Sequence, residues 1–153
     1  MSKHRVYDVL GQLTRFHAFP DDVEGKFCLA EVLVPPGLGA PPNAHAGETE
    51  AFYVLQGRVD FTVGGATQRV EAGGFVSIPD GAVHAFAAVG PDPARILVLN
   101  APGRMHEQFF TTVGREVPAD TSTLSPLDGP PDFAAVAAAA EAAGMTILPP
   151  GDA

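Results

Sequence analysis

Two histidines and one glutamate are the residues of this sequence whose types and spacing best fit metal chemistry. Four residues separate His45 from Glu50 in PPNAHAGETEAFYVLQG, and His84 lies further on in GFVSIPDGAVHAF. Two imidazoles and one carboxylate suit a single divalent transition metal ion and leave coordination positions open for a bound molecule. About 35 residues separate the two segments, so the site forms only if the fold brings two hairpins together.

Short strands separated by turns must bring the two ligand-bearing segments together. Between residues 4 and 100 the chain is rich in Val, Phe, Leu and Tyr runs with Gly or Pro between them, a pattern typical of an all-β sandwich or small barrel. Gly64-Gly65 is a two-residue hairpin signal. The predicted strands are Arg5–Leu10, Leu13–Phe19, Lys26–Val34, Ala51–Leu55, Arg58–Val63, Ala66–Val70, Phe75–Ile78, His84–Ala88 and Arg95–Leu99.

The pattern changes after residue 100. The spacing of apolar residues predicts a short helix over Arg104–Val113, and the alanine-rich run predicts another over Asp132–Ala143. Asp132 suits the N-terminal turn of that helix, and Gly144 suits its C-cap. Residues 116–131 hold four prolines and are expected to form a surface loop. No second domain is evident, so we expect residues 1–153 to form a single domain whose tail packs against the β core.

Two spaced motifs enclose the candidate ligands. The first consists of Gly37, Asn43, His45, Glu50 and Gly57, with five, one, four and six residues between them; the second consists of Gly73, Pro79, Gly81 and His84, with five, one and two between them. They closely resemble the paired motifs of the cupin superfamily, Gly-x5-His-x-His-x3,4-Glu-x6-Gly and Gly-x5-Pro-x-Gly-x2-His-x3-Asn. The resemblance implies a cupin-type double-stranded β-helix (jelly-roll barrel), with its core at about residues 25–100 and a C-terminal helical extension at about 104–150.

The sequence departs from these motifs at two positions. Asn43 replaces the first histidine, and Ala88 replaces the final asparagine, which is not a metal ligand. The resemblance then implies a facial triad of His45, Glu50 and His84, with Asn43 placed to coordinate weakly or to orient a metal-bound water or O2. The implied cofactor is one divalent metal ion (Fe, Mn, Ni, Zn or Cu). The alternative is a cupin that keeps the barrel and has lost the metal.

Strand alternation predicts the pocket walls. The expected substrate-pocket residues are Phe52, Val54, Phe61 and Phe86, although each could equally be an ordinary core residue. Glu31 lies within an apolar strand, so it is either at a solvated edge or a general base near the metal. The candidate catalytic residues are therefore Glu50, Asn43 and Glu31.

The remaining histidines and the first predicted helix lie outside the motifs. His4, His17 and His106 are expected to be surface or packing residues. Met105, Phe109 and Phe110 could cap the mouth of the barrel.

Composition excludes several classes of partner. The formal net charge is −9 and the seven arginines and two lysines are scattered, which argues against nucleic-acid binding. No apolar run is long enough to span a membrane. Cys28 is the only cysteine, and its apolar neighbours indicate a buried structural thiol rather than a reactive one. We expect a cytoplasmic protein that binds a small molecule and forms a homodimer, since edge strands such as Arg5–Leu10 need covering.

The function is predicted from the resemblance together with the ligand set. The run EAFYVLQGRVDFTVGG and the C-terminal extension resemble the small bacterial quercetinase-like cupins. This favours a metal-dependent dioxygenase-like enzyme that acts on a small aromatic or enolic compound. The alternatives are a non-redox cyclase or isomerase of secondary metabolism, and a small-molecule-binding protein without enzymatic activity.

Overall fold

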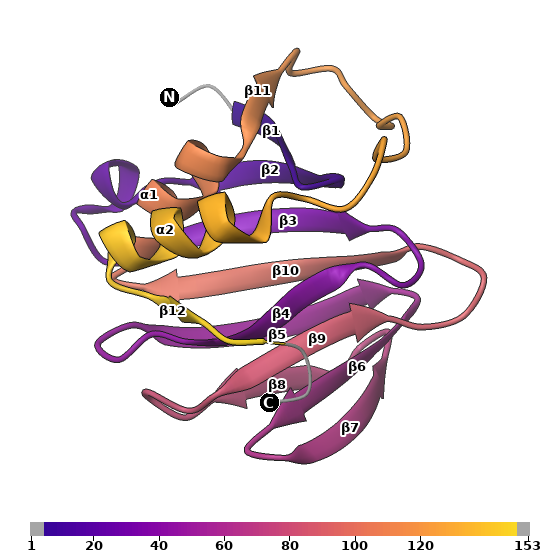
Figure 1. Cartoon of the computed structure of the whole chain (residues 1–153), viewed down its shortest axis with the longest axis horizontal. Coiled ribbons are helices and arrows are strands. Elements are labelled where there is room, and N and C mark those ends of the chain that lie inside the picture. The colour runs from indigo at the N-terminus through magenta and orange to yellow at the C-terminus, as the bar shows by residue number, and fades with distance from the viewer. Residues whose placement is uncertain (1–4, 150–153) are drawn as a thin grey trace.

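Two antiparallel sheets form the body of the protein (Figure 1). The computed structural model describes residues 5–149. The seven-stranded sheet has the order β11 (Arg115–Val117), β1 (Arg5–Val9), β2 (Gln12–Ala18), β3 (Cys28–Val34), β10 (Ala94–Ala101), β5 (Thr49–Gln56) and β8 (Phe75–Ile78). The five-stranded sheet has the order β12 (Thr146–Ile147), β4 (Gly39–Ala44), β9 (His84–Ala88), β6 (Arg58–Val63) and β7 (Ala66–Glu71).

The main hydrophobic core lies between the two sheets. Alternate residues of β3, β5 and β10 are buried, as the alternation of side chains along a strand requires, and several of them lie in this core. Val32, Val54 and Ile96 come from the larger sheet and meet Val59 and Phe61 of the smaller one. The fold is the all-β jelly-roll barrel with a C-terminal helical extension that the sequence predicts.

Most of the predicted strands are confirmed, and Gly64-Gly65 joins β6 to β7 with Val63 paired to Ala66. Strand β4 was not predicted, because its Pro41 and Pro42 argue against a paired strand. It nevertheless pairs with β9 across a register shift between Ala40 and Asn43. Gly39 permits this approach, since a Cβ there would lie 1.9 Å from the Phe86 carbonyl oxygen.

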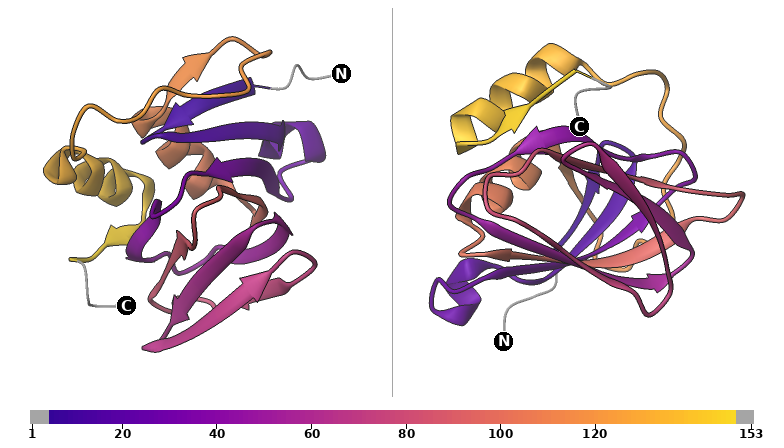
Figure 2. Two further views of the ribbon diagram at one scale, coloured as in Figure 1. Left: turned by 90° about the vertical axis from the view of Figure 1, so that its right-hand side faces the viewer. Right: turned by 90° about the horizontal axis from the view of Figure 1, so that it is seen from below.

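The C-terminal extension packs on the barrel as expected. Helix α1 (Arg104–Val113) and helix α2 (Phe133–Ala143) both form, with the Asp132 carboxylate accepting a hydrogen bond from the Ala135 N–H at 3.1 Å. The views in Figure 2 show both helices on one side of the barrel. After α2 the chain returns as β12 and pairs with β4.

The predicted loop over 116–131 begins with a short strand instead. Glu116 and Val117 belong to β11, which pairs with β1, so that the Arg5–Val9 edge is covered within the chain itself. The thiol of Cys28 is buried, and this burial is the main reason that its pKa is raised to about 12, as a structural cysteine requires. Within residues 5–149, no helix is long and apolar enough to cross a membrane.

Candidate metal centre

The structure brings His45, Glu50 and His84 together inside the barrel. His45 follows β4, Glu50 lies on β5 and His84 begins β9, so both sheets contribute. The Glu50 Oε1 atom lies 3.1 Å from His45 Nε2 and 2.8 Å from His84 Nε2. All three side chains are buried, with at most 5% of any residue exposed. The two hairpins that are distant in sequence therefore converge on one carboxylate.

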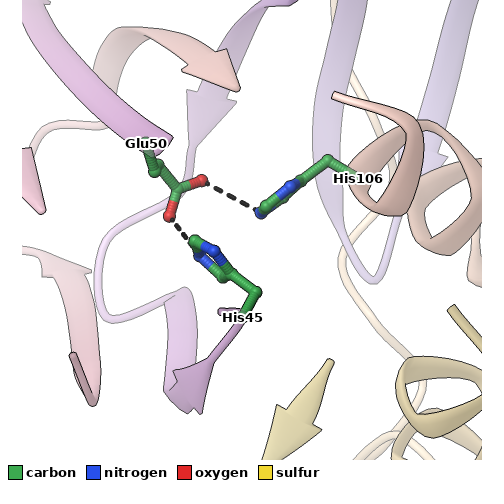
Figure 3. A group of neighbouring side chains, drawn as sticks. All are labelled: His45, Glu50 and His106. Atoms are coloured by element: carbon green, nitrogen blue, oxygen red, sulfur yellow. Dashed lines mark hydrogen bonds and ion pairs between the residues drawn. The ribbon is translucent and has the colours of Figure 1, made fainter. Parts of the chain in front are cut away.

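A third imidazole joins this cluster from helix α1. His106 Nε2 lies 3.3 Å from Glu50 Oε2, and the residue is 2% exposed. Figure 3 shows the Glu50 carboxylate directed toward both rings, with one oxygen facing His45 and the other facing His106. Potential ligand atoms of these three residues all lie within 4.8 Å of one another. The sequence indicates a surface or packing residue; His106 is not at the surface but is buried within the cluster.

Glu48 and Asn100 form a second layer around the cluster. The Glu48 carboxylate accepts hydrogen bonds from the Gly103 N–H at 2.6 Å, from the His106 N–H at 3.3 Å and from His106 Nδ1 at 2.7 Å. The Asn100 amide donates to Glu50 Oε2 at 2.6 Å. Glu48 thus fixes both the start of α1 and the ring of His106, while Asn100 fixes the Glu50 carboxylate.

The charges of the cluster are strongly coupled. Burial by itself would raise the pKa of Glu50, but the charge and hydrogen bond of His106, with hydrogen bonds from His45 and His84, hold that pKa well below its usual value. Burial by itself would lower the pKa of His106, but the two carboxylates that flank it raise that pKa to about 9. Burial by itself would raise the pKa of Glu48, but the hydrogen bond and charge of His106, together with backbone hydrogen bonds from Gly103 and Met105, lower that pKa. In this state an imidazolium lies between two carboxylates.

Each of the three imidazoles meets an oxygen acceptor at both of its ring nitrogens. The Nδ1 atoms of His45, His84 and His106 lie 3.1 Å from the Glu48 carbonyl oxygen, 2.9 Å from the Ala82 carbonyl oxygen and 2.7 Å from the Glu48 carboxylate. Their Nε2 atoms all face Glu50. A neutral imidazole carries a single N–H and cannot donate at both ends. Each Nε2 atom therefore needs a second proton or a cation beside it.

One divalent cation among His45, Glu50 and His106 would meet this requirement at two of the three rings, because ligand atoms of these three residues all lie within 4.8 Å of one another. Two ligand atoms at right angles and about 2.1 Å from an ion lie about 3.0 Å apart. The Nε2–carboxylate separations here are 2.8, 3.1 and 3.3 Å. Metal-binding histidines also commonly donate their other ring nitrogen to a carbonyl or carboxylate oxygen, as these three do. The donor atoms of His45, Glu50 and His106, with His84 bound to the same carboxylate, are therefore of the types that a divalent transition metal takes.

Asn43 lies beside the cluster and also binds the backbone. Its side-chain Nδ2 donates to the carbonyl oxygens of Pro41 at 2.9 Å and of His84 at 3.2 Å. Because both partners are acceptors, the amide nitrogen must face them, which leaves Oδ1 as the atom available to a ligand. Asn43 therefore ties β4 to β9 at the position where the motif has its first histidine.

The structure does not bring Glu31 to the cluster. Glu31 alternates with the buried residues of β3, so its side chain points to the outer face of the sheet. There its carboxylate lies 2.7 Å from Arg95 Nη1 and 3.2 Å from His17 Nε2. This position does not fit a general base at the cluster. Of the other predicted surface histidines, His17 lies on this outer face and His4 lies outside the described residues.

A cavity of about 290 Å³ opens next to the cluster. Glu50, His84, His106 and Asn43 line it at one end, and most of the remaining wall is apolar. Among the predicted pocket residues, Phe52 and Phe86 line the cavity, with ring centroids 5.4 Å apart. Val54 and Phe61 lie behind them in the core and do not reach it. Phe109 and Phe110 of α1 also line the wall, and Met105 does not.

Two of the three site residues that the sequence analysis missed, Glu48 and His106, carry a periodic signal in the sequence. Glu48 precedes Glu50 by two positions, which places both on the same side of an extended chain. His106 shares a helix face with Phe109, Phe110 and Val113, three, four and seven positions later. Asn100 has no comparable signal, because only the register that pairs it with Glu50 brings the two together.

Comparison with known proteins indicates the family of this chain. Residues 30–100 match the cupin domain family. An uncharacterized protein of Methanocaldococcus jannaschii is 31% identical over 98 residues, which is 63% of this chain and 78% of that protein. Quercetin 2,3-dioxygenase of Bacillus subtilis is 29% identical over 103 residues, which is 67% of this chain and 30% of that enzyme.

A solved structure supports the same assignment. The polyketide cyclase RemF from Streptomyces resistomycificus superposes with a TM-score of 0.57 at 25% identity, covering 67% of this chain and 80% of that protein. The family match over residues 30–100 includes His45, Glu50 and His84, within both cupin motifs. The chain therefore belongs to the cupin superfamily.

Proposed function

We propose that His45, Glu50, His84 and His106 hold one divalent metal ion (Fe, Mn, Ni, Zn or Cu). The observation that carries this proposal is the presence of an oxygen acceptor at both nitrogens of all three imidazoles, which a cation among the Nε2 atoms would satisfy. His106 takes the part of the motif histidine that Asn43 replaces. Because His106 lies outside residues 30–100, we further propose that residues 1–153 act as one cupin domain rather than as a barrel with an independent tail.

The enzyme we propose is an oxygenase, similar to quercetinase, that acts on a small aromatic or enolic compound. A divalent transition metal supplies Lewis-acid polarisation of a substrate oxygen and, when redox-active, electron exchange with O2. Four protein ligands would leave about two positions of an octahedral ion open, enough for a substrate oxygen and a second small molecule. Phe52 and Phe86 hold the apolar part of the substrate, and Asn43 orients a water or O2 at the polar end.

A non-redox cyclase or isomerase of secondary metabolism is the second candidate. It is favoured by the likeness to the polyketide cyclase RemF, which covers 80% of that protein, whereas the likeness to quercetin 2,3-dioxygenase covers only 30% of that enzyme. The cavity and the metal ligands serve both candidates, so the distinction lies in the chemistry and in whether O2 is required.

Oxygen consumption tests the two candidates directly. Protein loaded in turn with Fe, Mn, Ni, Zn or Cu is mixed with flavonols and β-diketones in an oxygen electrode, with and without air. The oxygenase predicts O2 uptake equal to substrate loss, no reaction without air, and loss of activity in His84→Ala but not in His17→Ala. Turnover without air, or with Zn(II), would establish the cyclase or isomerase instead. Ligand-induced thermal stabilisation without any turnover would contradict both and indicate a binding protein.

We also propose that the protein is a cytoplasmic homodimer whose copies meet through the outer face of the seven-stranded sheet. Tyr53 and Phe75 lie opposite each other there and are 41% and 64% exposed, with Leu55 and Leu99 nearby at 38% and 37%. Exposed apolar side chains grouped in this way are typical of interaction surfaces. The Arg95–Glu31 pair balances the charge of the same face, so a second copy can approach without repulsion.

Sedimentation equilibrium checks this assembly. The parent protein should sediment as a dimer, and Phe75→Asp should sediment as a monomer because it places a charge within the apolar contact. Phe133→Asp, which alters an exposed phenylalanine of the C-terminal extension, should leave the dimer intact. A monomeric parent protein, or a Phe75→Asp dimer as tight as the parent, would contradict the proposed interface. Fractionation of expressing cells checks the cytoplasmic location.

A further inference from the structure

The cavity beside the cluster has two different halves. One half belongs to the barrel and includes Asn43, Glu50 and His84, which His106 of α1 joins to complete the polar cluster. The other half is contributed by the segment that follows β10, through α1, the chain between β11 and α2, α2 itself and β12. This second half lies outside residues 30–100, so the family match does not describe it.

Two residues of the extension line the cavity and are also exposed to solvent. Leu127 and Phe133 are 41% and 47% exposed, and neither belongs to a hydrophobic cluster of the described chain. Leu124, three positions before Leu127, packs instead against Val6 and Leu13 and does not line the cavity. Large apolar side chains that face both a cavity and solvent mark its mouth and are available to contact a ligand.

The charge of the cavity wall limits what can bind. Within residues 5–149, no lysine or arginine lines the cavity, and the only acidic side chain that does so is Glu50. The cationic His106 lies in the His/Glu cluster. Away from that cluster, a ligand with a carboxylate, sulfonate or phosphate along its body would lose hydration without gaining a counter-charge. Five phenylalanines in the wall, Phe52, Phe86, Phe109, Phe110 and Phe133, favour flat aromatic ligands instead.

We propose that Leu127 and Phe133 form the specificity-determining half of the binding site, and that this site takes an uncharged, extended aromatic compound with one oxygen-bearing end. The oxygen-bearing end lies at the His/Glu cluster and the apolar end lies between Leu127 and Phe133. The orientation rests on the proposed metal centre. The preference for uncharged aromatic ligands rests on the cavity wall alone.

A pair of fluorescent probes with the same ring system tests the proposal. N-phenyl-1-naphthylamine is uncharged, and 8-anilino-1-naphthalenesulfonate adds a sulfonate to the same rings. Both are titrated against metal-loaded and chelator-treated protein. The uncharged probe should bind with a blue-shifted emission and at least about tenfold more tightly than the sulfonate. The double variant Leu127→Ala/Phe133→Ala should weaken its binding at least about tenfold, since each truncation removes apolar contact area.

Leu124→Ala is the matched control, because it truncates a leucine of the same segment outside the cavity and should leave probe affinity unchanged. Circular dichroism verifies that all variants fold. Equal affinity for the two probes would overturn the proposal, and so would unchanged affinity in the double variant. Metal content is measured in the same samples. Loss of probe preference with metal still bound contradicts this inference alone, and absence of metal with the probe preference intact contradicts only the proposed metal centre.

Discussion

Replacing Glu50 by glutamine should reduce divalent metal binding by at least about a hundredfold. Among residues 5–149, Glu50 is the only one whose side chain contacts all three imidazoles of the cluster, with oxygen–nitrogen distances of 2.8, 3.1 and 3.3 Å. An amide of the same size keeps the shape of the side chain but removes its negative charge and replaces one ligand oxygen by a nitrogen that must donate. Metal content after equilibrium dialysis against Zn(II) or Co(II) measures the effect.

Glu31→Gln provides a matched control. Glu31 also lies within hydrogen-bonding distance of a histidine, His17, but on the outer face of the sheet beside Arg95. Its replacement should leave metal content unchanged. Full metal occupancy in Glu50→Gln at the affinity of the parent protein would show that the cluster is a buried ion-pair network and not a metal centre.

Replacing Glu48 by alanine should give the largest loss of stability of any single substitution at the site. The Glu48 carboxylate is 2% exposed and accepts three hydrogen bonds, from the Gly103 and His106 N–H groups and from His106 Nδ1. Its removal leaves two N–H groups at the start of α1 and a buried imidazolium without their acceptor. Breaking a buried ion pair in this way costs about 3–5 kcal/mol of the free energy of unfolding.

The same substitution should also weaken metal binding by about 10- to 100-fold, because His106 loses the group that orients its ring. Urea denaturation measures the stability and equilibrium dialysis measures the metal affinity. Glu48→Gln keeps an oxygen that can accept one N–H. Its stability and its metal affinity should therefore both lie between those of Glu48→Ala and those of the parent protein. Glu107→Ala removes a carboxylate from the next position of α1 and should change neither. A Glu48→Ala protein as stable as the parent would contradict the positioning role.

The strands could be predicted because their signals are local. Runs such as Phe75–Ile78 and His84–Ala88 are apolar and bounded by Gly or Pro, and the structure places strands at those positions. The N-cap Asp132 and the C-cap Gly144 likewise mark the second helix by local chemistry. Strand β4 could not be found in this way. Its prolines oppose a strand, and it forms because β9 and β12 pair with it from either side.

The alternation of side chains along β3 does not determine whether Glu31 points into the barrel or to its outer face. Alternation does place Glu31 on one face of its strand with Leu29 and Leu33, and Ala30 and Val32 on the other face. Both faces are apolar in sequence, so the pattern does not indicate which of them lines the barrel. The answer depends on the pairing of β3 with β2 and β10, which local sequence does not encode.

Distance along β5 explains why one of its two predicted pocket residues lines the cavity and the other does not. Phe52 and Val54 follow Glu50 on the same face, but each step of two residues adds about 6.6 Å. Phe52 therefore still reaches the cavity, whereas Val54 lies in the closed core beyond it. His106 shows the converse. No motif spacing predicts it, because it comes from a helix that reaches the cluster only when α1 packs over the barrel and Glu48 holds its first turn.

The metal centre itself is tested most directly by anomalous X-ray scattering from crystals of the untagged protein equilibrated with Co(II) or Zn(II). The proposed metal centre predicts one strong peak per chain, about 2.0–2.2 Å from the Nε2 atoms of His45, His84 and His106 and from a carboxylate oxygen of Glu50. No peak at saturating metal, or a peak held by other side chains while this cluster keeps its direct nitrogen–oxygen contacts, would contradict the account.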